Sequence, residues 1–385
     1  MRANYKTVFI MLFDVQSKEI EELFKTPIVQ QTAFWSEVKS KLGSKTIAVN
    51  FKSGTKSLYN SETNNHPLNS DVLIIIQYVS NHACIAYVPY GPELEPDGDL
   101  QGRFLEELSE CLRSFLPRNC IMIRYDLCWE SYWAKDDSCF DFEGNWLGEP
   151  EKYAQELRFN FSTFNWNFKK AHSNILPANT IYLDLKPDIE EVLARMKPKT
   201  RYNINLSLRK GINVRTAGME SLHVWYALYR ETALRNNILL NDIRYFEAIL
   251  TSKADNTNSP AEVQLLIAEL DNIPLAAMFL IITGNRGSYL YGASSGSFRN
   301  YMSTYALQWE AIKMSKEKGC TEYDMFGISP NPDTSHPLYG LYKFKSGFGG
   351  NIFHSLGCWD YPLDAEKYNA FRNFELKSQG FHLGN

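Results

Sequence analysis

Residues 287–329 read GSYLYGASSGSFRNYMSTYALQWEAIKMSKEKGCTEYDMFGIS, and the fold is decided here. The first residues predict a strand with Tyr289 and Tyr291 on one face, because side chains alternate between the two faces of a strand. A polar loop follows. Apolar residues at helical spacing then predict a helix that begins near Ser303, and a second strand at 321–326 ends the stretch.

The first half of the chain contains nearly the same order of elements. In both halves, apolar strands precede a helix and a last strand that ends in Tyr-Asp. The segments are 72–78, 84–87, 102–116 and 121–125 in the first half, and 263–270, 275–282, the helix from Ser303 and 321–326 in the second. A shared order at a long period predicts an α+β protein made of two duplicated units. Such units are typical of acyl-transfer folds, in which a cleft forms where two strands diverge.

Length and charge limit the classes of protein. A chain of 385 residues indicates two or three domains. The formal net charge of −4 means that any nucleic-acid contact has to be a local patch. The seven histidines have no metal-ligand spacing, so we expect no metal, and nothing indicates a cofactor.

The cysteines and the N-terminus point to a cytoplasmic protein. The seven cysteines are odd in number and form no CxxC pair, which fits reduced thiols. The apolar run 8–13 is far shorter than the ~20 residues of a spanning helix and predicts a strand, not a signal peptide.

Periodicity and turn residues place the remaining elements. We expect helices at 19–24, 32–42, 198–210, 220–234, 243–251 and 365–377, a strand at 46–51, and loops at 53–70 and 89–99. Residues 129–168 contain twelve aromatic residues in forty. We interpret them as a connector packed on both domains, since aromatics mostly supply buried area; lining a substrate groove is the alternative.

Several motifs resemble a known family. YLYGASS, YALQWEAI, YDMFGIS and LYGLYKFKSGFGG (338–350) are similar to the C-terminal half of the Fem family, and segments 31–43, 177–185 and 196–212 fit more loosely. These are peptidoglycan bridge-forming aminoacyltransferases. The resemblance implies two acetyltransferase-like domains, 1–175 with 350–385 and 176–349. Some members of the family carry a long helical hairpin arm, but this sequence shows no insert that could form a coiled-coil arm.

The reaction implied by this resemblance is aminolysis of an ester. An amine of a peptidoglycan stem peptide attacks the carbonyl that joins an amino acid to the 3′ end of a tRNA. The partners are then aminoacyl-tRNA and a muropeptide precursor, either lipid-linked or nucleotide-linked. Peripheral contact with the inner face of the membrane is left open.

Two residues match catalytic positions of the family. Lys345, in LYKFK, matches a functional lysine whose ammonium would stabilise the oxyanion or hold the terminal adenosine. Asp126 matches an aspartate near the acceptor, where a carboxylate can bind the ammonium or accept its proton. The structural alternatives are a solvated lysine beside Lys343 and a buried aspartate that caps a turn.

Other residues match precursor-binding positions. Lys39 matches a lysine that grips a diphosphate, and Tyr245 matches a binding tyrosine. Either Tyr289 or Tyr291 matches a tyrosine that the family has on this strand, and the sequence does not decide between them. The sequence departs from the nucleotide-binding member at Asn241, where that member has an arginine, which puts a bidentate phosphate grip in doubt.

A run of basic residues lies between 195 and 215 with no Asp or Glu. It is the best local candidate for tRNA phosphates, although such runs are usually solvated helix faces. The candidate residues are Arg195, Lys197, Lys199, Arg201, Arg209 and Lys210.

Two other classes of protein compete with this interpretation. An acyl-CoA N-acyltransferase would need a glycine-rich pyrophosphate loop, and the corresponding loop here, SSGSFRNYMS, lacks that spacing. A catalytically dead protein that binds the precursor or tRNA would not need Lys345, Asp126 and the tyrosines.

Overall fold

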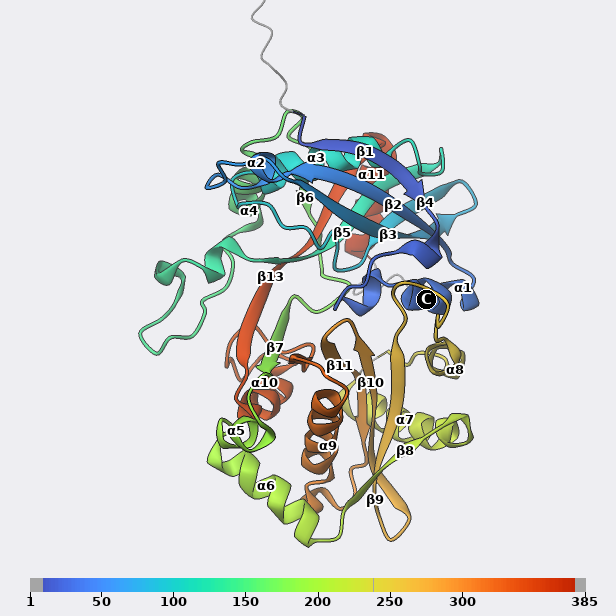
Figure 1. Ribbon diagram of the computed structural model, residues 1–385, viewed down its shortest axis with the longest axis vertical. Coiled ribbons are helices and arrows are strands. Elements are labelled where there is room, and N and C mark those ends of the chain that lie inside the picture. Colours follow the sequence, from blue (N-terminus) through green and yellow to red (C-terminus); the bar gives the residue numbers. More distant parts are fainter. Residues whose placement is uncertain (1–9, 238, 378–385) are drawn as a thin grey trace, which may run out of the picture.

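The computed structural model describes residues 10–237 and 239–377, and the strands in these residues form one 13-stranded sheet. Figure 1 shows the molecule as an upper and a lower half, each with its own part of the sheet and its own helices. No helix in this part of the chain is long and apolar enough to cross a membrane.

The upper half contains antiparallel strands followed by a parallel one. Its elements are β1 (Leu12–Lys18), β2 (Lys45–Gly54), β3 (Pro67–Ser80), β4 (Ala83–Val88), α3 (Gln101–Leu112) and β5 (Cys120–Glu130). Strands β1 to β4 pair antiparallel in order, and β5 pairs parallel to β4 after the crossover through α3.

The lower half repeats this topology. Its elements are β8 (Asn213–Ala217), β9 (Glu262–Leu270), β10 (Ile273–Thr283), β11 (Arg286–Ser294), α9 (Ser303–Glu317) and β12 (Glu322–Asp324). Strands β8 to β11 are antiparallel, and β12 pairs parallel to β11 after the crossover through α9. The predicted duplication is therefore confirmed, but β3 corresponds to β10 and not to β9, because four antiparallel strands precede the helix in each half and the fourth, β4 or β11, pairs parallel to the strand after the helix.

One strand joins the two halves. The end of β13 (Asn351–Pro362) pairs with β5, and its beginning pairs with β7 (Asn179–Asp184). The short β6 (Lys169–Lys170) also pairs with β13. The chain thus returns to the first half after Gly350, as the resemblance implied. The boundaries 1–175 with 350–385 and 176–349 stay a prediction.

Helices cover the sheet and fill the junction. They are α1 (Ala33–Lys41), α2 (Thr55–Leu58), α4 (Lys152–Asn160), α5 (Ile189–Ala194), α6 (Pro198–Arg209), α7 (Leu222–Asn236), α8 (Ile243–Thr251), α10 (Tyr339–Lys345) and α11 (Ala365–Lys377). Helix α1 of the upper half packs against α8 of the lower half, and one apolar core includes residues of both halves. The longest described helices, α7 and α9, have 15 residues each, so no coiled-coil arm occurs in the described residues.

Three predicted segments differ in the structure. The predicted loop 53–70 is wrong at both ends, because β2 runs to Gly54 and the paired strand β3 starts at Pro67. The predicted helix 19–24 is only a 3₁₀ turn, Ile20–Glu22. Of the predicted strand 8–13, residues 8 and 9 lie outside the described residues, and β1 begins at Leu12.

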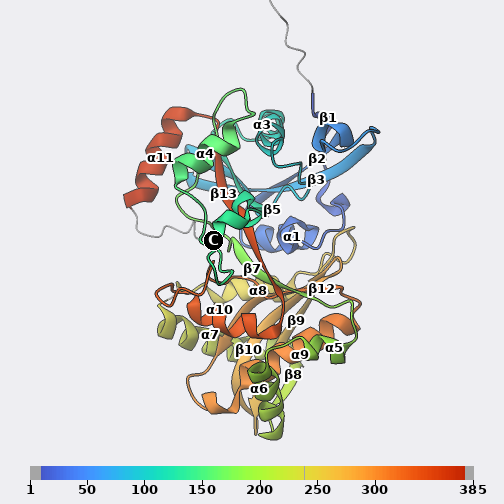
Figure 2. The same ribbon diagram turned by 90° about the vertical axis from the view of Figure 1, so that its left-hand side faces the viewer.

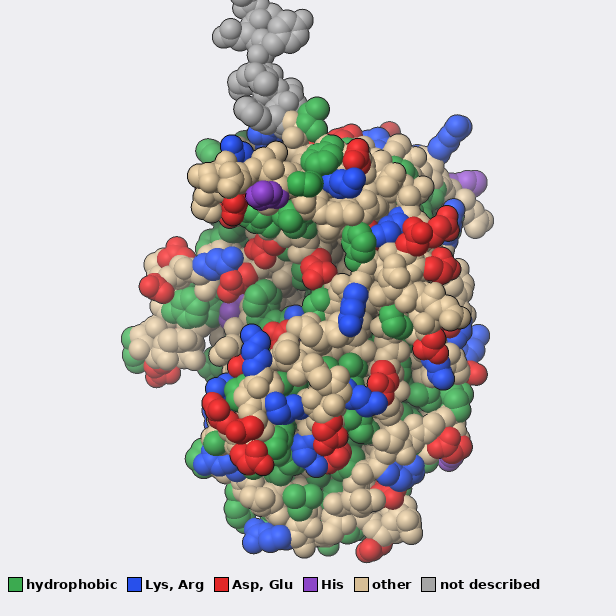
Figure 3. All heavy atoms as spheres, viewed as in Figure 1, with side chains coloured by type: hydrophobic (Ala, Val, Ile, Leu, Met, Phe, Trp, Pro, Cys, Tyr) green, Lys and Arg blue, Asp and Glu red, His purple; other side chains and the backbone are tan. Residues whose placement is uncertain are grey.

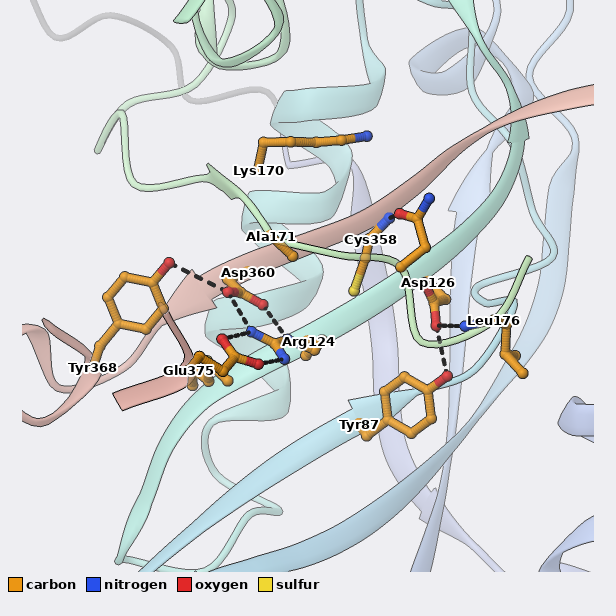
Figure 4. A network of polar contacts seen from close by, with 12 residues as sticks. Tyr87, Arg124, Asp126, Lys170, Ala171, Leu176, Cys358, Asp360, Tyr368 and Glu375 are labelled. Atoms are coloured by element: carbon orange, nitrogen blue, oxygen red, sulfur yellow. Dashed lines mark hydrogen bonds and ion pairs between the residues drawn. The ribbon is translucent and has the colours of Figure 1, made fainter. Parts of the chain in front are cut away.

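A buried ion cluster fastens the last helix to the sheet. Figure 4 shows Arg124 of β5 between Asp360 of β13 and Glu375 of α11. The guanidinium Nε lies 2.6 Å from Asp360 Oδ1, and Nη1 lies 2.5 Å from Glu375 Oε1. Tyr368 of α11 donates to the other oxygen of Asp360. The Arg124 and Asp360 side chains are each 2% exposed, so the arginine neutralises two buried carboxylates.

We expect Arg124→Met to destabilise the protein by about 3–5 kcal/mol, because it leaves two buried carboxylates without their countercharge. Equilibrium urea unfolding measures this loss. Lys313→Met is the matched control, since Lys313 pairs with Glu310 on α9, both side chains are about one-third exposed, and the loss should be less than about 1 kcal/mol. Equal losses in the two variants would show that the cluster adds no stability.

Candidate functional site

The two parallel strands of the lower half separate where the site is found. Strands β11 and β12 pair only from Arg286 to Ser288, after which β12 ends at Asp324 and β11 continues to Ser294. The sequence predicted a cleft where two strands diverge, and the divergence is at this point. The turn after β12 and helix α10 close it.

Lys345 lies inside this opening. Its side chain comes from the last residue of α10, and the residue is 3% exposed. The Nζ donates to the carbonyl oxygens of Phe326 at 2.9 Å and Gly327 at 2.8 Å, and it lies 5.0 Å from the centre of the Tyr289 ring. Burial lowers the pKa of Lys345 to about 7, against the opposing charge of Asp324. It is therefore not the solvated lysine of the structural alternative.

The turn that Lys345 contacts has a strained backbone. Phe326 has φ +58°, a left-handed conformation that a phenylalanine rarely adopts and that costs about 1–3 kcal/mol. Its N–H donates to Asp324 Oδ1 at 2.8 Å while its carbonyl accepts from Lys345. These two contacts hold the turn, so Lys345 also fixes the shape of the opening.

The prediction that Tyr289 and Tyr291 share a face is wrong. Tyr291 pairs with Phe279 and Tyr289 pairs with the adjacent Leu280, so Leu290 is an extra residue on β11. Such a β-bulge breaks the two-residue alternation. Tyr289 consequently packs on the side of α9 and Lys345, whereas Tyr291 packs in the core shared by both halves.

A second cluster contains three of the predicted precursor-binding residues. The hydroxyls of Tyr245 on α8 and Tyr291 on β11 are 2.8 Å apart. Lys39 Nζ, on α1, lies 5.4 Å from the Tyr245 ring and 5.3 Å from the Trp35 ring. Burial lowers the pKa of Lys39 to about 8. The junction thus brings together residues from both halves, while Tyr289 lies apart with Lys345.

Asp126 is 1% exposed and held by neighbours on three sides (Figure 4). Its Oδ2 accepts from the Tyr87 hydroxyl at 2.6 Å and from the Leu176 N–H at 3.0 Å. Burial raises the pKa of Asp126, and the bonds to Tyr87, Leu176 and Cys358 oppose that rise. The carboxylate therefore does not face solvent, and its surroundings match the alternative of a buried aspartate that holds neighbouring backbone.

A cavity of about 40 Å³ lies between the halves, room for one or two water molecules. Residues in its wall that the sequence analysis did not single out include Tyr90, Tyr182, Arg286 and Phe326. Asp324 also lines it and accepts a 2.5 Å bond from Thr180 Oγ1. The duplication could have pointed to Asp324 from the sequence. Tyr323-Asp324 in β12 corresponds to Tyr125-Asp126 in β5.

The basic run is partly neutralised in space. Arg195 pairs with Glu191 at 2.5 Å and with Asp184 at 3.4 Å, although no acidic residue lies within the run itself. Arg201 donates to the carbonyls of Ala194 and Met196, and Lys210 donates to Asn300. Figure 3 shows basic and acidic side chains interspersed over α5, at the lower left of the molecule. Lys197, Lys199 and Arg209 are exposed.

The lowered pKa of Lys345 makes stability depend on pH. Below about pH 7 the folded protein carries a buried ammonium, and this cost disappears as pH rises towards the unfolded value of about 10.4. We therefore expect the stability of Lys345→Met, relative to wild type, to fall between pH 7 and pH 10 by up to about 1.4 kcal/mol per pH unit. Urea unfolding at several pH values measures this. The exposed Lys343→Met is the control; a pH-independent difference for Lys345→Met would contradict the assignment.

Comparisons with known proteins agree with this architecture. The chain is 26% identical over 299 residues to a protein named Lipid II:glycine glycyltransferase from Staphylococcus epidermidis, over 61% of this chain and 71% of the relative. A protein of the same name from Staphylococcus saprophyticus is 25% identical over 260 residues, over 53% of this chain and 63% of the relative.

A solved structure described as the crystal structure of FemX has the same fold. It superposes with a TM-score of 0.68 at 17% identity and covers 94% of this chain and 100% of its own. The family model described as the FemAB family matches residues 24–258 and 251–375. Because these matches include most of the chain, the protein belongs to the FemAB family.

Proposed function

We propose that the protein transfers an amino acid from an aminoacyl-tRNA to an amine of a lipid-linked peptidoglycan precursor, in the cytoplasm, and so forms an interpeptide bridge. Family membership and the names of the relatives support an aminoacyltransferase that acts on such a precursor. The observation that carries the proposal is the buried Lys345 at the divergence of β11 and β12.

The reaction requires positioning more than covalent catalysis. The acceptor nitrogen bonds to the ester carbonyl carbon, and the carbonyl oxygen becomes an oxyanion. The intermediate collapses, the bond to the terminal ribose oxygen breaks, and the ammonium loses a proton while the ribose hydroxyl gains one. An aminoacyl ester is already activated, so a fixed positive group at the oxyanion is the main need.

Lys345 is suited to this step in our proposal. Two of its N–H bonds hold the turn at Phe326 and Gly327, which leaves the third for a substrate oxygen. A pKa near 7 also lets it give and take a proton at physiological pH. Tyr289, in contact with it, would fix its position.

The acceptor would bind at the junction. Lys39 is the cation for the diphosphate, and Tyr245 and Tyr291 are the aromatic hydroxyls for the sugar or peptide. For Asp126 we propose a role near the acceptor amine, exerted through the backbone: its hydrogen bond to the Leu176 N–H fixes the segment that enters β7.

The donor would reach Lys345 from the side of α6. Lys197, Lys199 and Arg209 are exposed cations for phosphates; Arg195, Arg201 and Lys210 are engaged by protein groups and would contribute less. The loop between β11 and α9, which lacks a glycine-rich pyrophosphate pattern, favours tRNA over acyl-CoA. A buried, lowered-pKa lysine favours an active enzyme over a binding protein.

We expect Lys345→Met to lower the single-turnover rate by about 10²–10³, because it removes an oxyanion-stabilising donor, with little change in precursor affinity. The assay combines charged tRNA with lipid-linked precursor, and product mass identifies the transferred amino acid. Lys343→Met, exposed on the same helix, should change the rate little. Equal losses would mean that the lysines act only through general electrostatics.

We expect the double substitution Lys199→Glu and Arg209→Glu to weaken tRNA binding and reduce its salt dependence, because fewer phosphate counterions are released. Filter binding at increasing salt measures both. The double substitution Lys45→Glu and Lys56→Glu, at exposed positions of the upper half, is the control, because it changes the net charge by the same amount. Tight binding of acetyl-CoA without tRNA binding at low salt would contradict the proposed donor.

A further inference from the structure

Helix α4 turns apolar side chains outward. Tyr153, Leu157 and Phe161 follow at four-residue spacing along the helix and its last turn, and they are 77%, 45% and 75% exposed. The buried side of the helix carries Phe159 together with the polar Gln155. A surface helix normally has the opposite arrangement, with its polar face towards water.

The segment after α4 extends this surface. Phe164 and Trp166 are 63% and 48% exposed. We call Tyr153, Leu157, Phe161, Phe164 and Trp166 the aromatic face. The sequence predicted that residues 129–168 pack their aromatic side chains; Trp129, Phe159 and Phe168 do so, but the aromatic face does not.

Buried polar groups hold this segment in place. The carboxylate of Glu106, a residue 3% exposed, accepts from the Phe164 N–H at 2.7 Å and the Asn165 N–H at 2.8 Å. The Asn160 amide donates to the Phe168 carbonyl at 2.9 Å and accepts from its N–H at 3.0 Å. The aromatic side chains are thus presented by a fixed backbone.

The rim of the aromatic face carries cations. The Arg103 guanidinium lies 5.6 Å from the Phe164 ring. Lys152, which precedes Tyr153, has its pKa lowered by burial and by the positive charges of Arg372 and the buried Lys170, against the opposing charges of Glu156 and Asp360. Figure 2 shows α4 and α11, which carries Arg372, on the same outer side of the upper half.

The exposed Phe142 is not part of this surface. It is 96% exposed, but it lies between Asp141 and Glu143 in the loop that precedes α4. An anionic surface repels such acidic neighbours. Glu151 and Glu156 also border the aromatic face, but Glu151 precedes Lys152 and Glu156 pairs with Lys169 at 3.6 Å, so basic residues offset them.

We propose that the aromatic face is a docking surface for an anionic lipid bilayer. Trp, Tyr and Phe side chains with adjacent cations match the interfacial region of a membrane, where apolar rings enter the headgroup boundary and cations meet anionic headgroups. The inference rests on the proposed function, since a lipid-linked precursor lies in that bilayer.

Co-sedimentation of the full chain with vesicles tests the proposal. The triple variant Phe161→Ser, Phe164→Ser and Trp166→Asn removes three rings, and Asn suits the positive φ of +52° at position 166. We expect the wild-type protein to bind vesicles of phosphatidylglycerol and phosphatidylethanolamine. Its binding to vesicles of phosphatidylcholine alone, which carry no net charge, should be weaker. The triple variant should lose at least about tenfold in partition coefficient. Leu234→Ser, 81% exposed on α7, is the matched control.

Further measurements separate the alternatives. With Trp166→Phe, binding should persist while quenching of tryptophan fluorescence by brominated lipid decreases. A wild-type protein that ignores vesicles, or a triple variant that is folded by circular dichroism and binds them equally well, overturns the proposal. A dimer in light scattering that the triple variant dissociates also overturns it, because the face would then bind a second copy.

A transfer assay with two acceptors, one with and one without the lipid tail, distinguishes the docking inference from the proposed function. The triple variant should keep its rate on a precursor without the lipid tail and lose rate on lipid-linked precursor in vesicles. Equal rates of the triple variant and wild type on both acceptors would overturn the docking role. Absence of any transfer by wild type, with vesicle binding intact, would contradict the proposed function and leave the docking surface standing.

Discussion

The pairing of β13 with both β5 and β7 is the constraint on which the rest of the structure depends. A strand that contributes backbone hydrogen bonds to both halves limits how far the halves can move apart, because separation would expose unpaired N–H and C=O groups. The same strand carries Asp360, whose ion pair with Arg124 fastens it to β5. Helix α11 joins this arrangement through Glu375.

The candidate site follows from this junction. Lys39 belongs to the upper half and Tyr245 and Tyr291 to the lower half, so their contact exists only when the halves are joined. Lys345 and Asp126 are both buried and both bind backbone groups. Burial costs free energy for each, and the hydrogen bonds offset part of that cost. Charged groups of this kind shape the turns at the candidate site.

The aromatic residues of segment 129–168 divide between the protein core and the solvent-exposed surface. Trp129 and Phe159 fill the core of the upper half, and Trp146 stacks on His354 of β13. Other aromatic side chains of the same segment face water, held there by Glu106 and Asn160. Composition alone cannot separate these uses, because a ring contributes the same apolar area to a core and to a lipid surface.

The sequence by itself determined the duplication, many of the strands and helices and the resemblance to the family, because periodicity and turn residues are local properties. It did not indicate the strands β8 and β13. The helix at Pro198–Arg209 was predictable in this way, whereas only the resemblance to the family singled out Lys345. Only the tertiary structure decided that Leu290 forms a bulge and sends Tyr289 and Tyr291 to different faces. It also decided that Asp184 and Glu191 neutralise Arg195. Strand register and ion partners depend on residues distant in the chain, and no local pattern specifies them.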